Sequence, residues 1–430
     1  MSYTKENTTI VTSLVETEEF KRKFRTKEQD FTRNRKMGIK EIVMYELNKK
    51  GLSSKMEIFK FQKLININEI SAPAVLKQRE KLKSEAFEHL RDESLKLFYT
   101  KYKKEVKTYK GYIPTAIDGV DFEIPNTKAN REKYNGNQKK HCARLTVSNM
   151  YDLLNKYVLD TIIEKYDYSE KTMAKTHQEK VKGKTGKYKT IRIMDRGYPD
   201  LSSFYHDIKE DDKFLVRLRK NDYKNEIDGM KSNDEIIGIG YEYNRIKYYK
   251  TSNPDVYEYF KSGQKLSVRV IKVELAHEME ILLTNLDFSY EEIIELYKMR
   301  WGIETAYHYL KESLKIEAIT SSKPILIEQD IYSQILVYNI LQSFINEEEA
   351  KINQSKYKNE MKINVNMAIG IFKEGFILAL LEDEDTKRGK IVETICNDIS
   401  KYIVPIKPGR SSPRNKNRKN KYHYNKRKSF

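Results

Sequence analysis

The hydrophobic periodicity of this chain changes near residue 106, and that change limits the folds open to it. Before this point, apolar residues recur at helical spacing. After it come runs typical of strands, and then segments with helical and strand character in alternation. Strands first, followed by alternating helices and strands, predict an α/β domain with a mixed sheet. The first expected strands lie in 111–125, which we interpret as two strands turning at Gly119, in 143–152 and in 156–166.

The regions around this core divide the chain further. Residues 1–105 read as a helical N-terminal DNA-binding domain, and 222–288 as an all-β insertion between core segments 106–221 and 289–350. Residues 351–430 read as a helical C-terminal region with a basic tail. Segments 37–51 and 71–90 could form a helix-turn-helix-like DNA reader. An ordinary helical domain with a solvated basic face explains that pattern at least as well. The reader's basic and polar residues would be Lys77, Gln78, Arg79 and Lys81.

The charge of the chain is strongly positive and unevenly placed. Its 430 residues carry a formal net charge of +18, no acidic residue follows Asp398, and residues 401–430 hold 11 Lys and Arg. Such a tail favours a flexible arm on a polyanion such as nucleic acid, although a solubility tail would look similar. Cys142 and Cys396 are too few for a disulfide framework, and the polar first ten residues predict no secretory signal.

Residues 289–314 predict a helix with two distinct faces. Ser289 and Glu292 form a capping box, so the helix should begin there. At about 100° per residue, four polar side chains fall within an arc of roughly 60° along about 21 Å of one outward face. A carboxylate on that line can hold a divalent metal, and the cations and phenol can hold phosphates. A plain solvated face explains such a helix in isolation equally well. The four residues are Tyr297, Arg300, Glu304 and Lys311.

Two further carboxylates strengthen the functional interpretation. Asp118 and Asp195 each end an apolar run where a strand should leave the sheet, with a glycine close behind. With Glu304 they follow the order of a ribonuclease H-like core: first strand, later strand, then a helix packed on the sheet. Clustered oxygen ligands favour Mg²⁺ or Mn²⁺. Two such ions about 4 Å apart would serve an in-line displacement at phosphorus, attacked by water or a 3′-hydroxyl.

These motifs together resemble a known family. The spacing Tyr297-x2-Arg300-x3-Glu304-x6-Lys311 is similar to the Tyr-Arg-Glu-Lys signature of bacterial insertion-sequence transposases of the insertion-sequence-4 family, in the DDE class. "AIDGVDFEIP" and "MDRGYP" resemble its two aspartate boxes, "SAPAVLKQREKL" its N-terminal helical motif, and 222–288 its strand insertion. The resemblance covers most of the chain, and the four-residue signature with two spaced aspartates is its specific part.

The resemblance implies a transposase that binds terminal inverted repeats, cleaves the ends and joins 3′-hydroxyls to target DNA. Asp118, Asp195 and Glu304 would be catalytic and hold two Mg²⁺ or Mn²⁺ ions, while Tyr297, Arg300 and Lys311 would contact DNA phosphates. A homodimer would hold both double-stranded ends in the bacterial cytoplasm, on the nucleoid when bound to DNA. For Trp301, packing under the insertion is the favoured interpretation.

Other functions remain open at this stage. A nuclease of the same fold, which cleaves without joining strands, would carry the same acids. A DNA-binding protein with an inert site is less expected, because Asp118, Asp195 and Glu304 are all present. Gly183-Lys184-Thr185 resembles part of a phosphate-binding loop, but Gln178 stands where that loop needs glycine, so an ATPase is excluded.

Overall fold

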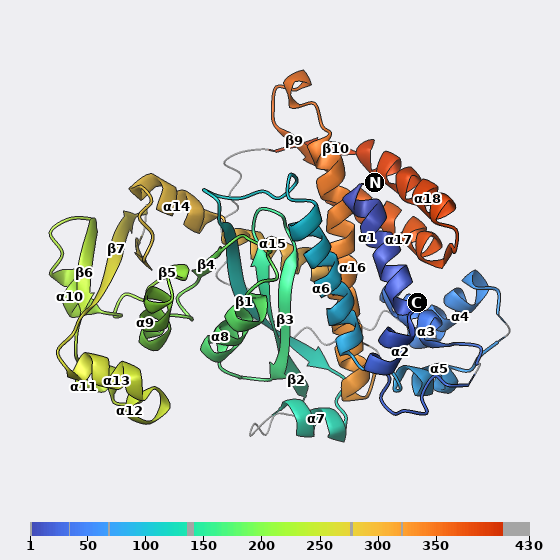
Figure 1. The fold of residues 1–430 in the computed structure, drawn as a ribbon, viewed down its shortest axis with the longest axis horizontal. Helices are drawn as coiled ribbons and strands as arrows, with labels where there is room; N and C mark the ends of the chain where they lie inside the picture. The colour runs from blue at the N-terminus through green and yellow to red at the C-terminus, as the bar shows by residue number, and fades with distance from the viewer. Residues whose placement is uncertain are drawn as a thin grey trace.

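One large mixed sheet with helices on both faces organises the molecule (Figure 1). The computed structural model describes residues 2–33, 35–67, 69–135, 142–275, 278–319 and 321–406. The eight strands of the sheet lie in the order β3-β2-β1-β4-β5-β8-β7-β6. The mixed α/β sheet expected from the sequence is therefore present. Among the described residues, no helix is long and apolar enough to cross a bilayer.

The first five strands fit a ribonuclease H-like core. β1 is antiparallel to β2, and β2 is antiparallel to β3. On its other side β1 is parallel to β4, which is parallel to β5. The helical segments between the parallel strands supply the crossovers that such pairing needs. The strand bounds are β1 Ile113–Ile124, β2 Ala143–Asp152, β3 Val158–Lys165, β4 Thr190–Met194 and β5 Lys213–Arg217.

β1 is one long strand, so the prediction of two strands turning at Gly119 is wrong. Gly119 stays extended and pairs with Ser148, because β2 offers an unbroken partner along this stretch. β4, in contrast, pairs with β1 only from Ile113 to Ala116. Asp118 therefore lies inside β1 but just beyond the end of its pairing with β4.

The all-β insertion expected over 222–288 is also wrong in its middle. Strands β6 (Asp234–Ile239), β7 (Leu266–Glu274) and β8 (Met279–Thr284) are present, and β8 pairs with β5, so they extend the core sheet. Between β6 and β7 the chain is helical, because Ile246, Val256 and Phe260 bury at helical spacing against the sheet. The helices between β6 and β7 are α11 Tyr243–Ile246, α12 Tyr249–Ser252 and α13 Pro254–Lys261, and the short helix α10 (Lys224–Asp228) precedes β6.

Helices cover the two faces of the sheet with separate hydrophobic clusters. α8 (Glu170–Val181), α9 (Leu201–Lys209) and α13 pack on one face. α14 (Tyr290–Lys298), α15 (Trp301–His308) and α16 (Pro324–Ala350) pack on the other. The outer helix α7 spans Lys128–Tyr134.

The N-terminal and C-terminal helices gather around α16, where Figure 1 shows the blue and red ends side by side. They share one hydrophobic cluster with α15 and the sheet, so the domain boundaries expected at 105 and 350 stay predictions. The basic tail from residue 407 onward lies outside the described residues. The helices are α1 Tyr3–Val15, α2 Glu18–Phe24, α3 Ile39–Leu47, α4 Ser54–Leu64, α5 Ala72–Arg79, α6 Glu85–Lys101, α17 Val365–Leu381 and α18 Asp385–Ser400, with a two-stranded sheet of β9 (Met361–Ile363) and β10 (Ile403–Pro405) and a 3-10 turn, η2, at Gln354–Lys356.

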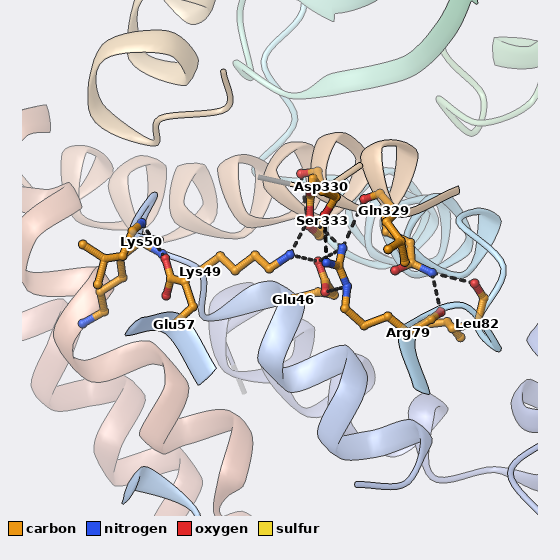
Figure 2. A network of polar contacts seen from close by, with 12 residues as sticks. Glu46, Lys49, Lys50, Glu57, Arg79, Leu82, Gln329, Asp330 and Ser333 are labelled. Atoms are coloured by element: carbon orange, nitrogen blue, oxygen red, sulfur yellow. Dashed lines mark hydrogen bonds and ion pairs between the residues drawn. The ribbon is translucent and has the colours of Figure 1, made fainter. Parts of the chain in front are cut away.

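The helix-turn-helix-like reader is contradicted at its central residue. α4 intervenes between α3 and α5, and Arg79 at the end of α5 is only 1% exposed. Figure 2 shows the Arg79 guanidinium between Glu46 of α3 and Asp330 of α16, with its Nη2 2.7 Å from Asp330 Oδ1. Lys49 Nζ completes the network, 2.7 Å from Glu46 Oε2. Arg79 therefore joins the N-terminal helices to α16 and cannot reach DNA.

Candidate active site

Asp118 lies at the point where β1 outruns β4. Its cross-strand partner is Asn149, whose side-chain amide donates to the Tyr307 hydroxyl of α15, so Asp118 faces the α14–α15 side of the sheet. Its Oδ1 accepts a hydrogen bond from the Gly119 N–H at 3.0 Å. Burial raises the pKa of Asp118 to about 6; the Gly119 N–H and Arg300 counteract this rise, and the charge of Glu304 adds to it.

Asp195 follows β4 directly, as the sequence predicted. Its Oδ1 accepts a hydrogen bond from the Arg196 N–H at 2.8 Å, and its carbonyl accepts one from the Tyr198 N–H at 3.1 Å. These bonds form a tight turn that holds the carboxylate at the strand end. Because parallel strands deliver their ends to one edge of a sheet, Asp195 lies beside the overhanging half of β1.

The signature segment begins as predicted but is not one continuous helix. The Ser289–Glu292 capping box is present, with Glu292 Oε2 2.8 Å from the Ser289 N–H. The helix breaks at Met299 and Arg300, where the Gly302 N–H bonds the carbonyl three residues back, Met299 O, at 2.8 Å. α15 follows, and Tyr309–Ser313 forms a single π-helical turn, η1. A steady 100° per residue therefore misplaces side chains beyond the break.

The outward-facing polar stripe is wrong for Tyr297 and Arg300. These side chains are only 6% and 7% exposed and point at the acids. The Tyr297 hydroxyl lies 3.5 Å from Asp195 Oδ1, and Arg300 Nη2 donates to Glu304 Oε1 at 3.0 Å. Arg300 also lowers the pKa of Asp118 against the dominant effect of burial. The positive charge of Arg300 therefore acts on all three acids, because Asp195 also raises the pKa of Arg300, although its hydrogen bond is to Glu304.

Lys311 stands apart from this group. It lies in η1, its Nζ is 2.8 Å from Glu317 Oε1, and it rests 5.4 Å from the ring centre of Phe122, four residues beyond Asp118 on β1. The structure thus gathers Asp118, Asp195 and Glu304 with Tyr297 and Arg300, and places Lys311 further along the same face.

Trp301 and Arg217 both depart from the sequence analysis. Trp301 is 50% exposed, so the interpretation that it packs under the insertion is wrong. Arg217, at the end of β5, was not anticipated. Its guanidinium pairs with Glu280 at 3.2 Å. Burial acts to lower the pKa of Arg217, but the charges of Glu280 and, more weakly, Asp195 raise it. The sequence signal that could have identified Arg217 was its place at the end of a buried strand.

The acids form a donor set suited to a hard divalent cation. Carboxylate oxygens are the ligands that Mg²⁺ and Mn²⁺ prefer, and the raised pKa of Asp118 shows that local positive charge does not compensate this cluster. Among the described residues, the one trio of possible ligands with all donor atoms within 4.8 Å is Glu347, Glu348 and Cys396, away from this edge of the sheet.

Comparison with known families bears on this geometry. The family model described as "Transposase DDE domain" matches residues 109–340, which is more than half of the chain and includes all three acids. The chain belongs to this family. This DDE transposase match confirms the resemblance inferred from the aspartate boxes and the Tyr-Arg-Glu-Lys spacing.

Two transposases of IS4-type elements are similar to the chain. The transposase InsG for insertion sequence element IS4 of Escherichia coli is 25% identical over 285 residues, covering 63% of this chain and 60% of that protein. The putative transposase for insertion sequence element IS4SA of Synechocystis is 29% identical over 162 residues, covering 37% of this chain and 43% of that protein. The chain thus matches less than two thirds of either relative.

A solved structure of a piggyBac transposase synaptic complex with hairpin DNA aligns with 94% of this chain and 87% of its own, at 13% identity and a TM-score of 0.45.

Proposed function

We propose that this chain is a DNA transposase that binds the terminal inverted repeats of an insertion sequence, cleaves the ends and joins the 3′-hydroxyls to target DNA. The observation that carries the proposal is the meeting of Asp118, Asp195 and Glu304 at one edge of the sheet, around Arg300, in a chain of the DDE transposase family.

Asp118, Asp195 and Glu304 would together hold two divalent metal ions, either Mg²⁺ or Mn²⁺. Bound there, the metal supplies positive charge for in-line phosphoryl transfer. The chain's part is to fix the carboxylates: β1 holds Asp118, the Asp195 turn is closed by its own backbone bonds, and Arg300 holds Glu304 at 3.0 Å. Arg300 has to release Glu304, at least in part, when that carboxylate takes metal.

Tyr297, Arg300 and Lys311 would bind the phosphates next to the scissile bond. Arg300 Nε is buried and has no hydrogen-bond partner among the described residues, so the guanidinium would have to turn outward to offer this donor to a phosphate oxygen. The Tyr297 hydroxyl, 3.5 Å from Asp195, can donate to a neighbouring oxygen. Lys311, further along the face, would contact the next stretch of backbone.

The remaining regions would serve assembly on DNA. A homodimer would hold both double-stranded ends in a synaptic complex, in the bacterial cytoplasm and nucleoid. The helices of 1–105, the insertion of 222–288 and the basic C-terminal tail would supply contacts outside the catalytic edge, and the net charge of +18 on the whole chain suits a polyanion.

Purified full-length chain, with Mg²⁺ and DNA carrying the ends of its own element, tests the proposal. We expect cut 3′ ends and products joined to target DNA. Glu304→Gln should abolish both steps and keep end binding, while Glu291→Gln, an exposed position on α14, should change neither. Cleavage without joining would favour a nuclease, and end binding without cleavage would favour an inert DNA-binding protein.

A further inference from the structure

A fourth carboxylate, Glu170, reaches the acidic edge from the other face of the sheet. Glu170 is the first residue of α8, whose packing face lies opposite α15. An added Cβ on Gly197 would come 2.7 Å from Glu170 Oε2, and one on Gly119 would come 3.9 Å from Oε1. The Glu170 carboxylate therefore lies between the glycines that follow Asp118 and Asp195.

The register of β1 shows that Glu170 and Glu304 approach from opposite sides. Gly119 pairs with Ser148, whose hydroxyl lies 3.0 Å from His177 Nε2 of α8, so Gly119 faces α8. Its neighbour Asp118 faces α15, as side chains alternate along a strand. Beyond the end of β4, Glu170 therefore lies on the α8 face of the sheet and Glu304 lies on the α15 face.

Glu170 has no cation bound to it. Among the described residues, no Lys or Arg nitrogen lies within 4 Å of its carboxylate, and the cation that acts on its pKa is Arg219. Burial, and then the charges of Asp121 and Asp195, raise the pKa of Glu170 despite Arg219. A partly buried carboxylate close to other carboxylates destabilises the folded chain unless a cation binds among them.

A second observation points to a ligand at this place. Tyr198 is 5% exposed, and its hydroxyl has no hydrogen-bond partner among the described residues. Burial first, and then the charges of Asp118 and Glu170, raise the pKa of Tyr198, so the hydroxyl lies close enough to these acids to be affected by their charge. Buried hydroxyls almost always have a partner, and one without a partner commonly marks a missing water or ion.

We propose that Glu170 and the Tyr198 hydroxyl bind the water shell of the divalent cation held by Asp118 and Asp195. Their ligand would be a hydrated Mg²⁺ or Mn²⁺ ion, approached from the α8 face. Both are positioning residues, because they act through water rather than on DNA. The inference rests on the metal site of the proposed function and adds two residues to it.

Manganese binding to the full-length chain without DNA tests the inference. Titration with Mn²⁺, followed by electron paramagnetic resonance of the free ion, gives the dissociation constant, and water-proton relaxation reports the water on the bound ion. Glu170→Gln should raise the dissociation constant about tenfold, as loss of an outer ligand partner does, and change the relaxation per bound ion. Tyr198→Phe should shift both in the same direction.

Two further variants make the outcomes distinguishable. Glu179→Gln removes one charge from an exposed position of α8 and should leave binding unchanged. Asp118→Asn should weaken binding more than Glu170→Gln does. If Glu170→Gln matches Glu179→Gln while Asp118→Asn loses binding, the inference fails and the proposed metal site stands. If Asp118→Asn has no effect, both fall. Thermal unfolding in EDTA should show each variant folded, with Glu170→Gln no less stable than wild type.

Discussion

Two charged clusters lie within this molecule, and they differ in balance. The network of Figure 2 sets two cations, Arg79 and Lys49, against two anions, Glu46 and Asp330. At the edge of the sheet, Arg300 acts on Asp118, Asp195 and Glu304, while Glu170 on the other face has Arg219 as the cation that acts on its pKa.

The difference separates a cluster that holds the fold together from one that awaits a ligand. Burial would raise the pKa of Asp330, but Lys49 and Arg79 overcome this and lower it, whereas for Glu46 the same two cations do not fully offset the rise that burial causes. Burial raises the pKa of Asp118 to about 6, and Arg300 does not overcome it. A balanced buried network is therefore expected to fail when one member is removed, and an unbalanced cluster to gain stability when one acid is removed or a cation is added.

The largest effect should come from breaking the balanced network. Arg79→Met leaves buried Glu46 and Asp330 with Lys49 alone as their paired cation among the described residues, and should lower the free energy of unfolding by about 3 kcal/mol. Urea denaturation measures this loss. Lys77→Met, exposed on the same helix, is the control and should change little. A loss under about 1 kcal/mol for Arg79→Met would mean that the network does not hold α3, α5 and α16 together.

Adding a cation should stabilise the unbalanced cluster. Mn²⁺ at a hundred times its dissociation constant should raise the free energy of unfolding by about 2.7 kcal/mol, because it binds the folded chain only. Thermal unfolding with and without Mn²⁺ measures the gain. The Asp118→Asn variant should show much less of it, and an equal gain in that variant would place the ion elsewhere.

Removing one acid should stabilise the metal-free chain, with a clear dependence on pH. The pKa of Asp118 is about 6 in the folded state and its ordinary value is 3.8, so the unfolded chain releases this proton first. Wild type therefore loses stability as pH rises from about 4 through about 6, and the cost stays constant above that. Asp118→Asn escapes it and should be more stable by on the order of 2 kcal/mol at pH 8.

Unfolding in EDTA at pH 4.5 and pH 8 measures this gain from Asp118→Asn. The gain should be smaller at the lower pH, where much less of the cost has developed. A variant that is less stable than wild type at pH 8 would show that Asp118 is adequately compensated by Gly119 and Arg300.

The smallest effect on stability should come from Lys311, outside both clusters. Its surface pair with Glu317 is worth less than about 1 kcal/mol, so Lys311→Ala should barely change unfolding. Binding to end DNA should weaken, and the slope of log affinity against log salt should fall by about 1. Lys96→Ala, which removes a similar surface pair on α6, is the matched control. Equal affinities for the two variants would remove Lys311 from the DNA contacts.

The sequence predicted the parts of the fold that depend on local pattern. β2 has the expected bounds, Asp195 ends its strand, and the capping box starts α14, because alternation, strand ends and caps are written in neighbouring residues. The sequence did not predict that β1 continues through Gly119, since that depends on the unbroken pairing with β2.

The site was predictable in its members but not in its burial. Spacing along the chain selected Tyr297, Arg300 and Glu304, yet Tyr297, inside α14, and Arg300, at the helix break, are both buried, and neither the burial nor the break could be derived from a regular helical projection. Arg79 looked like a surface cation because its partner Asp330 lies 251 residues away. Glu170 gave no signal, because its place depends on two turns that meet only in the folded chain.

The pairing of β8 with β5 joins the insertion directly to the core sheet. Backbone bonds run without interruption from the strand that delivers Asp195 to the outermost strand β6, four strand spacings or about 19 Å away. A duplex gripped along that outer strand could not swing on a hinge relative to the carboxylates. The sheet would fix the distance between DNA bound at β6 and the three acids, and that distance would set the position of a cut.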